Sequence, residues 1–219
     1  MGLRILFEDE HLIAVVKPYG VLSQGNENTK SLCSDLGDYL KAKGERAEVF
    51  VIHRLDKTTG GVMVFAKTKD ASAKMSALVQ SGKFHKIYYA VVEGKLSSQT
   101  GELSDLLYHD KAKNKTYVVK RERKGVKQAK LCYTSCGEAE YDGCVVTKVE
   151  VLLLTGRTHQ IRVQFASRNH ALVGDRKYGS AIKAKNIALW SHEISFTHPF
   201  THELVKITAE PENEVFDVF

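Results

Sequence analysis

The segment FVIHRLDKTTGGVMVFAK, residues 50–67, joins two apolar runs through a short polar loop. The runs predict buried strands, and Gly60-Gly61 predicts a tight end to the loop between them. Asp56 stands in this loop, shortly after His53 and Arg54. A loop between two buried strands holds a side chain rigid yet accessible, so Asp56 is a candidate reactive group.

Two interpretations of Asp56 are open from these residues alone. The carboxylate could cap a turn by accepting hydrogen bonds from the amides of Thr58 or Thr59, a structural role only. It could instead carry chemistry. The order of residues favours chemistry, because His-Arg-Leu-Asp, two free positions, Thr, one position, Gly and an apolar strand closely resembles the signature of the RluA-class pseudouridine synthases. In that family the aspartate is catalytic.

Further motifs of this family follow in the family's order. Residues 86–94 resemble its K-x-Y-x-A strand, residues 155–163 contain G-R-T-H-Q-I-R-V, and residues 174–179 match G-D-x-x-Y-G. The opening segment 8–24, with its Lys-Pro-x-Gly sequence, is also typical. The resemblance implies the family's fold over the whole chain. That fold is α+β, with a mixed, mainly antiparallel sheet, flanking helices and a central cleft.

The resemblance also implies an activity and a set of site residues. Such enzymes isomerise a uridine in structured rRNA or tRNA to pseudouridine: the N1–C1′ bond breaks, the uracil turns, and C5 joins C1′. Asp56 matches the catalytic aspartate, and Arg54 the cation that fills the space of the flipped base. Tyr88 matches the tyrosine that stacks on the uracil, and Arg157 the arginine that grips the aspartate.

Simpler roles stay open for the same side chains. Arg54 could pair with a nearby acid, Tyr88 could be a core residue, and Arg157 could make a cap or surface contact. His53 is interpreted as structural. Only cleft shaping is assigned to the motif that contains Asp175 and Tyr178.

The chain departs from the family pattern at two positions. Gly60 replaces the usual serine of the central loop, and Gln164 replaces the usual histidine after Arg-Val. The first change removes a hydroxyl contact, and the second puts any role of that imidazole in doubt. The family's N-terminal RNA-binding module is also not expected ahead of Leu3, so extra RNA contacts must come from the catalytic domain.

Basic residues are concentrated in one segment. The chain carries a net charge of +6, and residues 109–130 hold nine bases against two acids. This segment predicts a hairpin insertion with arms at 115–119 and 129–134. Such a strip suits a polyanion, although lysines on a sheet edge also simply block aggregation. The residues expected to bind RNA are Lys120, Arg121, Arg123 and Lys124.

Composition bounds the remaining possibilities. A chain of 219 residues suits one catalytic domain, residues 1–219, expected to act as a monomer. The four cysteines form no paired C-x-x-C units, so we expect reduced thiols, no metal and no cofactor. No run approaches the ~18 apolar residues of a membrane span, and no signal peptide is evident, which predicts a cytoplasmic protein.

Two functions from other classes are alternatives to the isomerase. A glycoside hydrolase needs two carboxylates, whereas the motifs supply one. A non-catalytic RNA-binding module would suit the basic strip but has no use for Asp56.

Helices are expected in three places. The spacing of apolar residues predicts one over 31–43, and a second is expected to begin after Asp70 as N-cap. Residues 158–168 alternate as a strand would, but Ile161 and Phe165 also share one helical face, and a helix is chosen there.

Overall fold

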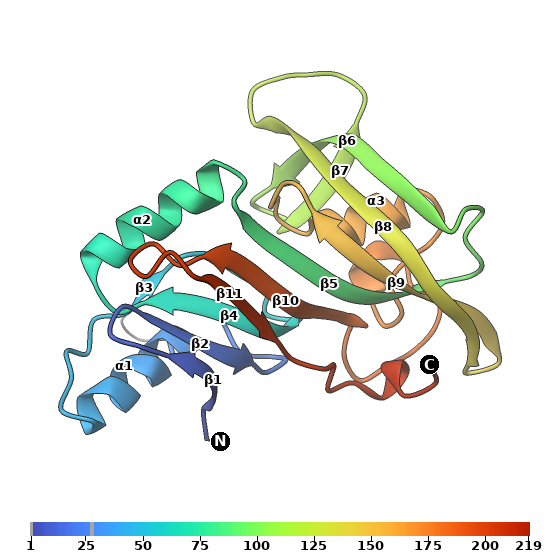
Figure 1. Ribbon diagram of the computed structural model, residues 1–219. Coiled ribbons are helices and arrows are strands. Elements are labelled where there is room, and N and C mark those ends of the chain that lie inside the picture. The colour runs from blue at the N-terminus through green and yellow to red at the C-terminus, as the bar shows by residue number, and fades with distance from the viewer. Residues whose placement is uncertain (1, 27–28) are drawn as a thin grey trace. The chain divides into compact units, whose positions relative to one another are not determined.

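The computed structural model describes residues 2–26 and 29–219 of the chain (Figure 1). Two compact units make up the protein. Unit 1 comprises Met1–Lys86 and Ser191–Glu210, and unit 2 comprises Ile87–Trp190 and Pro211–Phe219. The assignment of the whole chain to one domain therefore stays a prediction. No helix in the described part of the chain is long and apolar enough to cross a membrane.

Unit 1 is built around two completely buried strands. Every residue of β2 (Leu12–Lys17) and β4 (Gly60–Ala66) is buried, and the two pair antiparallel from Leu12↔Ala66 to Lys17↔Gly61. Burial on both faces explains why these strands are uninterrupted apolar runs in the sequence. The other strands of this unit are β1 (Arg4–Glu8), β3 (Phe50–Val51), β10 (Leu189–Thr197, whose first two residues belong to unit 2) and β11 (Leu204–Thr208).

Two capped helices complete unit 1. Helix α1 (Leu32–Ala42) begins at the predicted place, and its N-cap Ser31 forms a capping box with Ser34. Helix α2 is Lys69–Gln80, and its N-cap is Thr68, whose side chain accepts a hydrogen bond from the Ala71 amide at 3.2 Å. The prediction that Asp70 is the N-cap is wrong. It lies in the first turn, where its carboxylate is 3.0 Å from the ammonium of Lys74.

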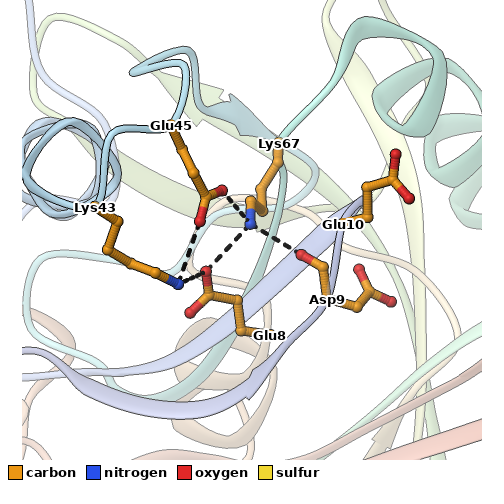
Figure 2. A pocket seen from close by; sticks show the side chains of 6 residues that line it. All are labelled: Glu8, Asp9, Glu10, Lys43, Glu45 and Lys67. Atoms are coloured by element: carbon orange, nitrogen blue, oxygen red, sulfur yellow. Dashed lines mark hydrogen bonds and ion pairs between the residues drawn. The ribbon is translucent and has the colours of Figure 1, made fainter.

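A ring of ion pairs joins the end of α1 to β1 and β4 (Figure 2). Glu8 lies 2.7 Å from the Lys43 ammonium and 3.1 Å from that of Lys67, and Glu45 contacts the same two lysines at 3.2 and 2.6 Å. The Tyr39 hydroxyl donates a further hydrogen bond to Glu8 at 2.9 Å. Each charge thus meets an opposite charge on both sides, which fixes the position of α1 beside the sheet.

Unit 2 is an antiparallel sheet with one short α-helix. Its strands follow the order β5-β9-β8-β6-β7, and every pairing within it is antiparallel. Together with the helices of unit 1, this sheet confirms the predicted α+β class. The strands are β5 (Phe84–Glu93, whose first residues belong to unit 1), β6 (Thr100–Asp110), β7 (Lys115–Val119), β8 (Val126–Tyr141) and β9 (Cys144–Leu153). The helices are α3 (Gln160–Ala166) and the 3-10 turns Arg176–Tyr178 and Glu214–Phe216.

The predicted pairing of the basic hairpin arms is wrong. Strands β7 and β8 both exist, but β6 lies between them and pairs with each. Strand β6 runs eleven residues, whereas its sequence reads as short and mixed. Residues 120–125 therefore form a connection from β7 to β8 that crosses β6. We call it the basic connection, because four of its residues are lysine or arginine.

The helix predicted over 158–168 is confirmed in type and is shorter than expected. Helix α3 begins only at Gln160, because His159 adopts a left-handed φ of 55° that a helix cannot contain. All but the last of its seven residues are buried, including Ile161 and Phe165, the residues on which the prediction was based.

The close approach of β4 to β10 in unit 1 makes a specific demand on Gly61. Its φ is +114°, and a Cβ there would lie 2.6 Å from the backbone nitrogen of Ser191 and closer still to the Ser191 carbonyl oxygen. Gly82 has a similar φ of +74° but no atom within 4 Å of such a Cβ. Comparison of Gly61 with Gly82 therefore separates the cost of backbone strain from the cost of a steric collision.

We expect Gly61→Ala to lower the free energy of unfolding by about 4 kcal/mol or more, because strain and collision add. The control Gly82→Ala bears the left-handed φ alone and should cost only about 1–2 kcal/mol. Urea unfolding of both variants measures the difference. Equal losses would mean that the β4–β10 approach adds nothing.

Candidate active site

The loop that carries Asp56 connects β3 to β4 within unit 1. Its apolar residue Leu55 is buried, Asp56 is half-buried, and Arg54 is exposed. The Thr59 amide donates to the backbone carbonyl of Asp56 at 3.0 Å and closes a turn directly before β4. The loop thus presents Arg54 to solvent while its backbone folds tightly against the sheet.

Hydrogen bonds fix the backbone on both sides of Asp56. The Ser23 hydroxyl donates to the Leu55 carbonyl at 2.8 Å and accepts from the Leu55 amide at 3.0 Å. The Gly20 amide donates to the Lys57 carbonyl at 2.8 Å. The segment after β2 therefore holds the residue before Asp56 and the residue after it.

Lys17 strengthens this support from inside the fold. Its side chain is fully buried, and its ammonium donates to the carbonyls of Pro18 at 3.0 Å, Val21 at 2.7 Å and Lys57 at 3.4 Å. Burial lowers the pKa of Lys17 to about 8, and the negative charge of Asp56 acts in the opposite direction. The Lys-Pro-x-Gly motif was evident in the sequence, but no role for Lys17 was predicted from it. A lysine that ends a wholly apolar strand was the available signal.

His53 is a structural residue of the same loop, as predicted. Its Nε2 accepts a hydrogen bond from the Val64 amide of β4 at 3.1 Å, so the neutral ring carries its proton on Nδ1. That Nδ1 atom is buried without a hydrogen-bond partner among the described residues. Burial, together with the nearby charge of Lys86, lowers the pKa of His53 to about 3.

Unit 2 holds the other two predicted site residues. Tyr88 is buried in β5, opposite Val151 of β9. Arg157 is exposed in the loop after β9, and its Nε donates to the backbone carbonyl of Gln128 in β8 at 2.9 Å. The Arg157 amide donates to Oε1 of Gln160 at 3.0 Å, which shapes the loop ahead of α3. Arg157 is therefore anchored on β8, a contact that sequence analysis missed.

The last two motifs are joined by a buried ion pair. Arg162 binds Asp175 with two hydrogen bonds, of 2.6 and 2.9 Å, and both side chains are buried. The Tyr178 hydroxyl accepts from the Thr116 amide of β7 and meets Nδ1 of His159, both at 2.8 Å. Burial raises the pKa of Tyr178, so this hydroxyl keeps its proton. These contacts fix the loop of Arg157 against β7.

The replacement of histidine by Gln164 has a local explanation. The side chain is fully buried, and its amide donates to the Asp105 carboxylate at 2.8 Å and to the Leu103 carbonyl at 3.2 Å. Arg168 binds the same carboxylate at 2.9 and 3.2 Å. Gln164 therefore joins α3 to β6 as a hydrogen-bond donor.

The predicted site residues divide between the units. Arg54 and Asp56 lie in unit 1, and Tyr88 and Arg157 in unit 2, so the grip of Arg157 on Asp56 stays a prediction. Across residues 2–26 and 29–219, no group of three or more metal-ligating side chains occurs. The four predicted RNA-binding residues are exposed on the connection from β7 to β8; they are Lys120, Arg121, Arg123 and Lys124.

The chain is similar in sequence to known RNA-modifying enzymes. The family model described as RNA pseudouridylate synthase matches residues 11–167. The dual-specificity RNA pseudouridine synthase RluA of Vibrio parahaemolyticus is 35% identical over 98% of this chain and 88% of its own. The ribosomal large subunit pseudouridine synthase D of Zymomonas mobilis is 32% identical over 95% and 69%.

Solved structures show the same fold. Human RNA pseudouridylate synthase domain containing 1 superposes with a TM-score of 0.77 over 96% of this chain and 84% of its own, at 21% identity. Human RNA pseudouridylate synthase domain containing 4 also gives 0.77, over 95% and 89%, at 22% identity.

The buried ring of His53 predicts a loss of stability in weak acid. In the unfolded chain this histidine binds a proton near pH 6.5, whereas in the folded chain it stays neutral down to about pH 3. The unfolded state therefore binds more protons below pH 6.5, and the free energy of unfolding falls as the pH drops. From pH 7.5 to 5.0 we expect His53 to contribute a loss of roughly 2 kcal/mol.

Urea unfolding at the two pH values tests this expectation. His53→Gln keeps an acceptor for the Val64 amide but does not titrate, so its stability should change less with pH than that of wild type. The exposed control His85→Gln should keep the wild-type pH dependence. A full wild-type loss in His53→Gln would contradict the assignment.

Proposed function

The chain belongs to the RNA pseudouridylate synthase family, and we propose that its isomerisation of uridine to pseudouridine in RNA depends on the carboxylate of Asp56. The observation that supports this most is the support of the loop. Hydrogen bonds from Ser23, Gly20 and Lys17 hold the backbone at Leu55 and Lys57. A side chain whose loop is fixed on both sides is oriented before the substrate arrives.

Asp56 acts in this proposal as nucleophile or base. The C1′–N1 bond of the uridine breaks, the uracil turns, and a C5–C1′ bond forms. C5 then loses its proton and N1 gains one, so the product is an isomer and no oxidant, reductant or other co-reactant is consumed. Either role requires an ionised carboxylate. The negative charge of Asp56 acts on the buried ammonium of Lys17, whose pKa it raises against the effect of burial.

The other site residues are assigned by their positions in the family motifs. Arg54 is exposed beside Asp56, where a long cationic side chain can fill the gap left by a flipped base and meet phosphates. Tyr88 stacks on the uracil in this proposal. Arg157 grips the catalytic carboxylate with nitrogens other than Nε, because Nε is bonded to Gln128.

Structured RNA is the proposed substrate, with large-subunit rRNA and tRNA as the candidates. One relative is named for the ribosomal large subunit and another as dual-specificity. Maps of pseudouridine in rRNA and tRNA, from cells with and without the gene, identify the modified position. We propose that the enzyme acts as a monomer without metal or cofactor.

Asp56→Asn tests the catalytic assignment, because the change is isosteric and removes only the charge. We expect pseudouridine formation to fall below detection while RNA affinity and the melting temperature stay close to wild type. The exposed aspartate of α1 gives a matched control, Asp38→Asn, which should retain full activity. Turnover within about tenfold of wild type in Asp56→Asn would exclude a nucleophile or base role. A non-catalytic RNA-binding module would form no pseudouridine even as wild type.

Neutralisation of the basic connection tests its role in RNA binding. We expect replacement of Lys120, Arg121, Arg123 and Lys124 by glutamine to weaken affinity and flatten its salt dependence by a slope of roughly 0.7–0.9 per lost phosphate contact. The single-turnover rate at saturating enzyme should change little, since Arg157 is held by a backbone carbonyl.

A matched control removes four exposed charges from unit 1. It replaces Lys41, Arg46, Lys69 and Lys83 by glutamine and should keep the wild-type salt slope. An unchanged salt slope after neutralisation of the basic connection would mean that its charges only keep a sheet edge solvated. A collapsed single-turnover rate with normal affinity would instead assign these residues to catalysis.

A further inference from the structure

Two tyrosines lie side by side on one face of the β6–β7 pair. Tyr108 of β6 is the register partner of Tyr117 of β7, and partners across an antiparallel pair point to the same face. The neighbouring residue Leu107 points to the other face, where it packs with Ala129 and Val163 of α3. The tyrosine pair therefore faces away from α3. Tyr117 is 37% exposed, which leaves part of its ring accessible.

The basic connection is folded onto this tyrosine face. It must cross β6, since Val119 ends β7 opposite Leu106 and Val126 begins β8 opposite Tyr108. The Val126 amide donates to the Arg123 carbonyl at 3.0 Å and closes a turn. Gly125 makes that turn possible with a φ of +87°, and a Cβ added there would lie 3.6 Å from the Tyr108 ring.

Cationic groups lie close to the tyrosine rings along this edge of unit 2. The guanidinium of Arg123 lies 4.7 Å from the centre of the Tyr108 ring. The Lys115 ammonium lies 5.8 Å from the Tyr117 ring and 5.5 Å from the Tyr178 ring. Protection of a sheet edge needs only the charges. Planar groups held among cations are the arrangement that binds the bases and the backbone of single-stranded nucleic acid together.

We propose that Tyr117 and the Arg123 guanidinium on Tyr108 form a stacking platform for unpaired nucleotides of the RNA substrate. A duplex offers this surface only its phosphates, because its bases are stacked on one another. An unpaired base can stack on a tyrosine ring or on a guanidinium plane, while Lys115 and the basic connection contact its phosphates. The proposal rests on the proposed function, since it describes how the same RNA is held.

The platform lies close to the anchor of Arg157 in the same unit. Arg157 bonds to the carbonyl of Gln128, and Val126, the partner of Tyr108, precedes Gln128 by two residues on β8. Two residues of a strand span about 7 Å. We therefore place the unpaired nucleotides near the Arg157 side chain in the same unit.

Tyr117→Leu tests the platform with two labelled probes that lack uridine and so cannot be turned over. One is a single-stranded RNA of about twelve nucleotides, and the other is a duplex of equal length. We expect the variant to bind the single strand about five- to tenfold more weakly, at the lower end of measured stacking contributions, and the duplex as well as wild type does. Tyr117→Phe should retain both affinities.

Two further variants control for the loss of a tyrosine elsewhere and for the loss of charge. Tyr141→Leu removes a tyrosine between Glu140 and Asp142 at the far end of β8 and should leave both affinities unchanged. Arg123→Lys keeps the charge but loses the planar group, so single-strand affinity should fall while the salt slope is kept. Melting temperatures confirm that each variant is folded.

Unchanged single-strand affinity in Tyr117→Leu, or an equal loss for both probes, would overturn the platform. Its failure is distinguishable from failure of the proposed function. Pseudouridine formed by wild-type enzyme and lost in Asp56→Asn would support the function even if Tyr117 proved silent. Conversely, selective loss of single-strand binding would support the platform even if no pseudouridine were detected.

Discussion

The buried ammonium of Lys17 is the constraint on which the Asp56 loop depends. Removing such a charge from water costs several kcal/mol unless hydrogen bonds replace the lost hydration. Three carbonyls, those of Pro18, Val21 and Lys57, supply these bonds, and they come from two separate segments of unit 1. The cost of burial is offset only when both segments are in place, so Lys17 couples the position of the Asp56 loop to the end of β2.

The sequence predicted the elements of unit 1 well because its core strands are buried on both faces. Strand β4 is apolar throughout, β2 is apolar up to Lys17 at its end, and α1 has apolar spacing with a serine cap. The partners of β7 were predicted wrongly. Alternation along a strand indicates which side chains share a face, but the choice of neighbour depends on contacts distant in sequence. Strand β6 was not recognised as a long strand, because polar residues interrupt its apolar pattern, yet it pairs with a neighbour on each edge.

The site shows a similar limit. Motif order identified Asp56 and Arg157 as candidates, but it could not show what holds them. The Arg157 side chain bonds to the carbonyl of Gln128, and Ser23 bonds to both backbone groups of Leu55. Backbone carbonyls and amides occur at nearly every residue, so a contact with them leaves no mark on the sequence of the partner. Lys17 was the exception, because a lysine inside a buried strand is unusual.

Strand β8 is where the separate features of unit 2 meet. Its first residue, Val126, lies opposite Tyr108, and its third, Gln128, bonds to Arg157. Both are held in register by β6, and β6 in turn is joined to α3 through Asp105 and Gln164. A strand paired in a sheet keeps its residues at fixed spacing. The proposed platform beside Tyr108 and the anchored side chain of Arg157 are therefore positioned by the same few residues of backbone, so the spacing between them is fixed.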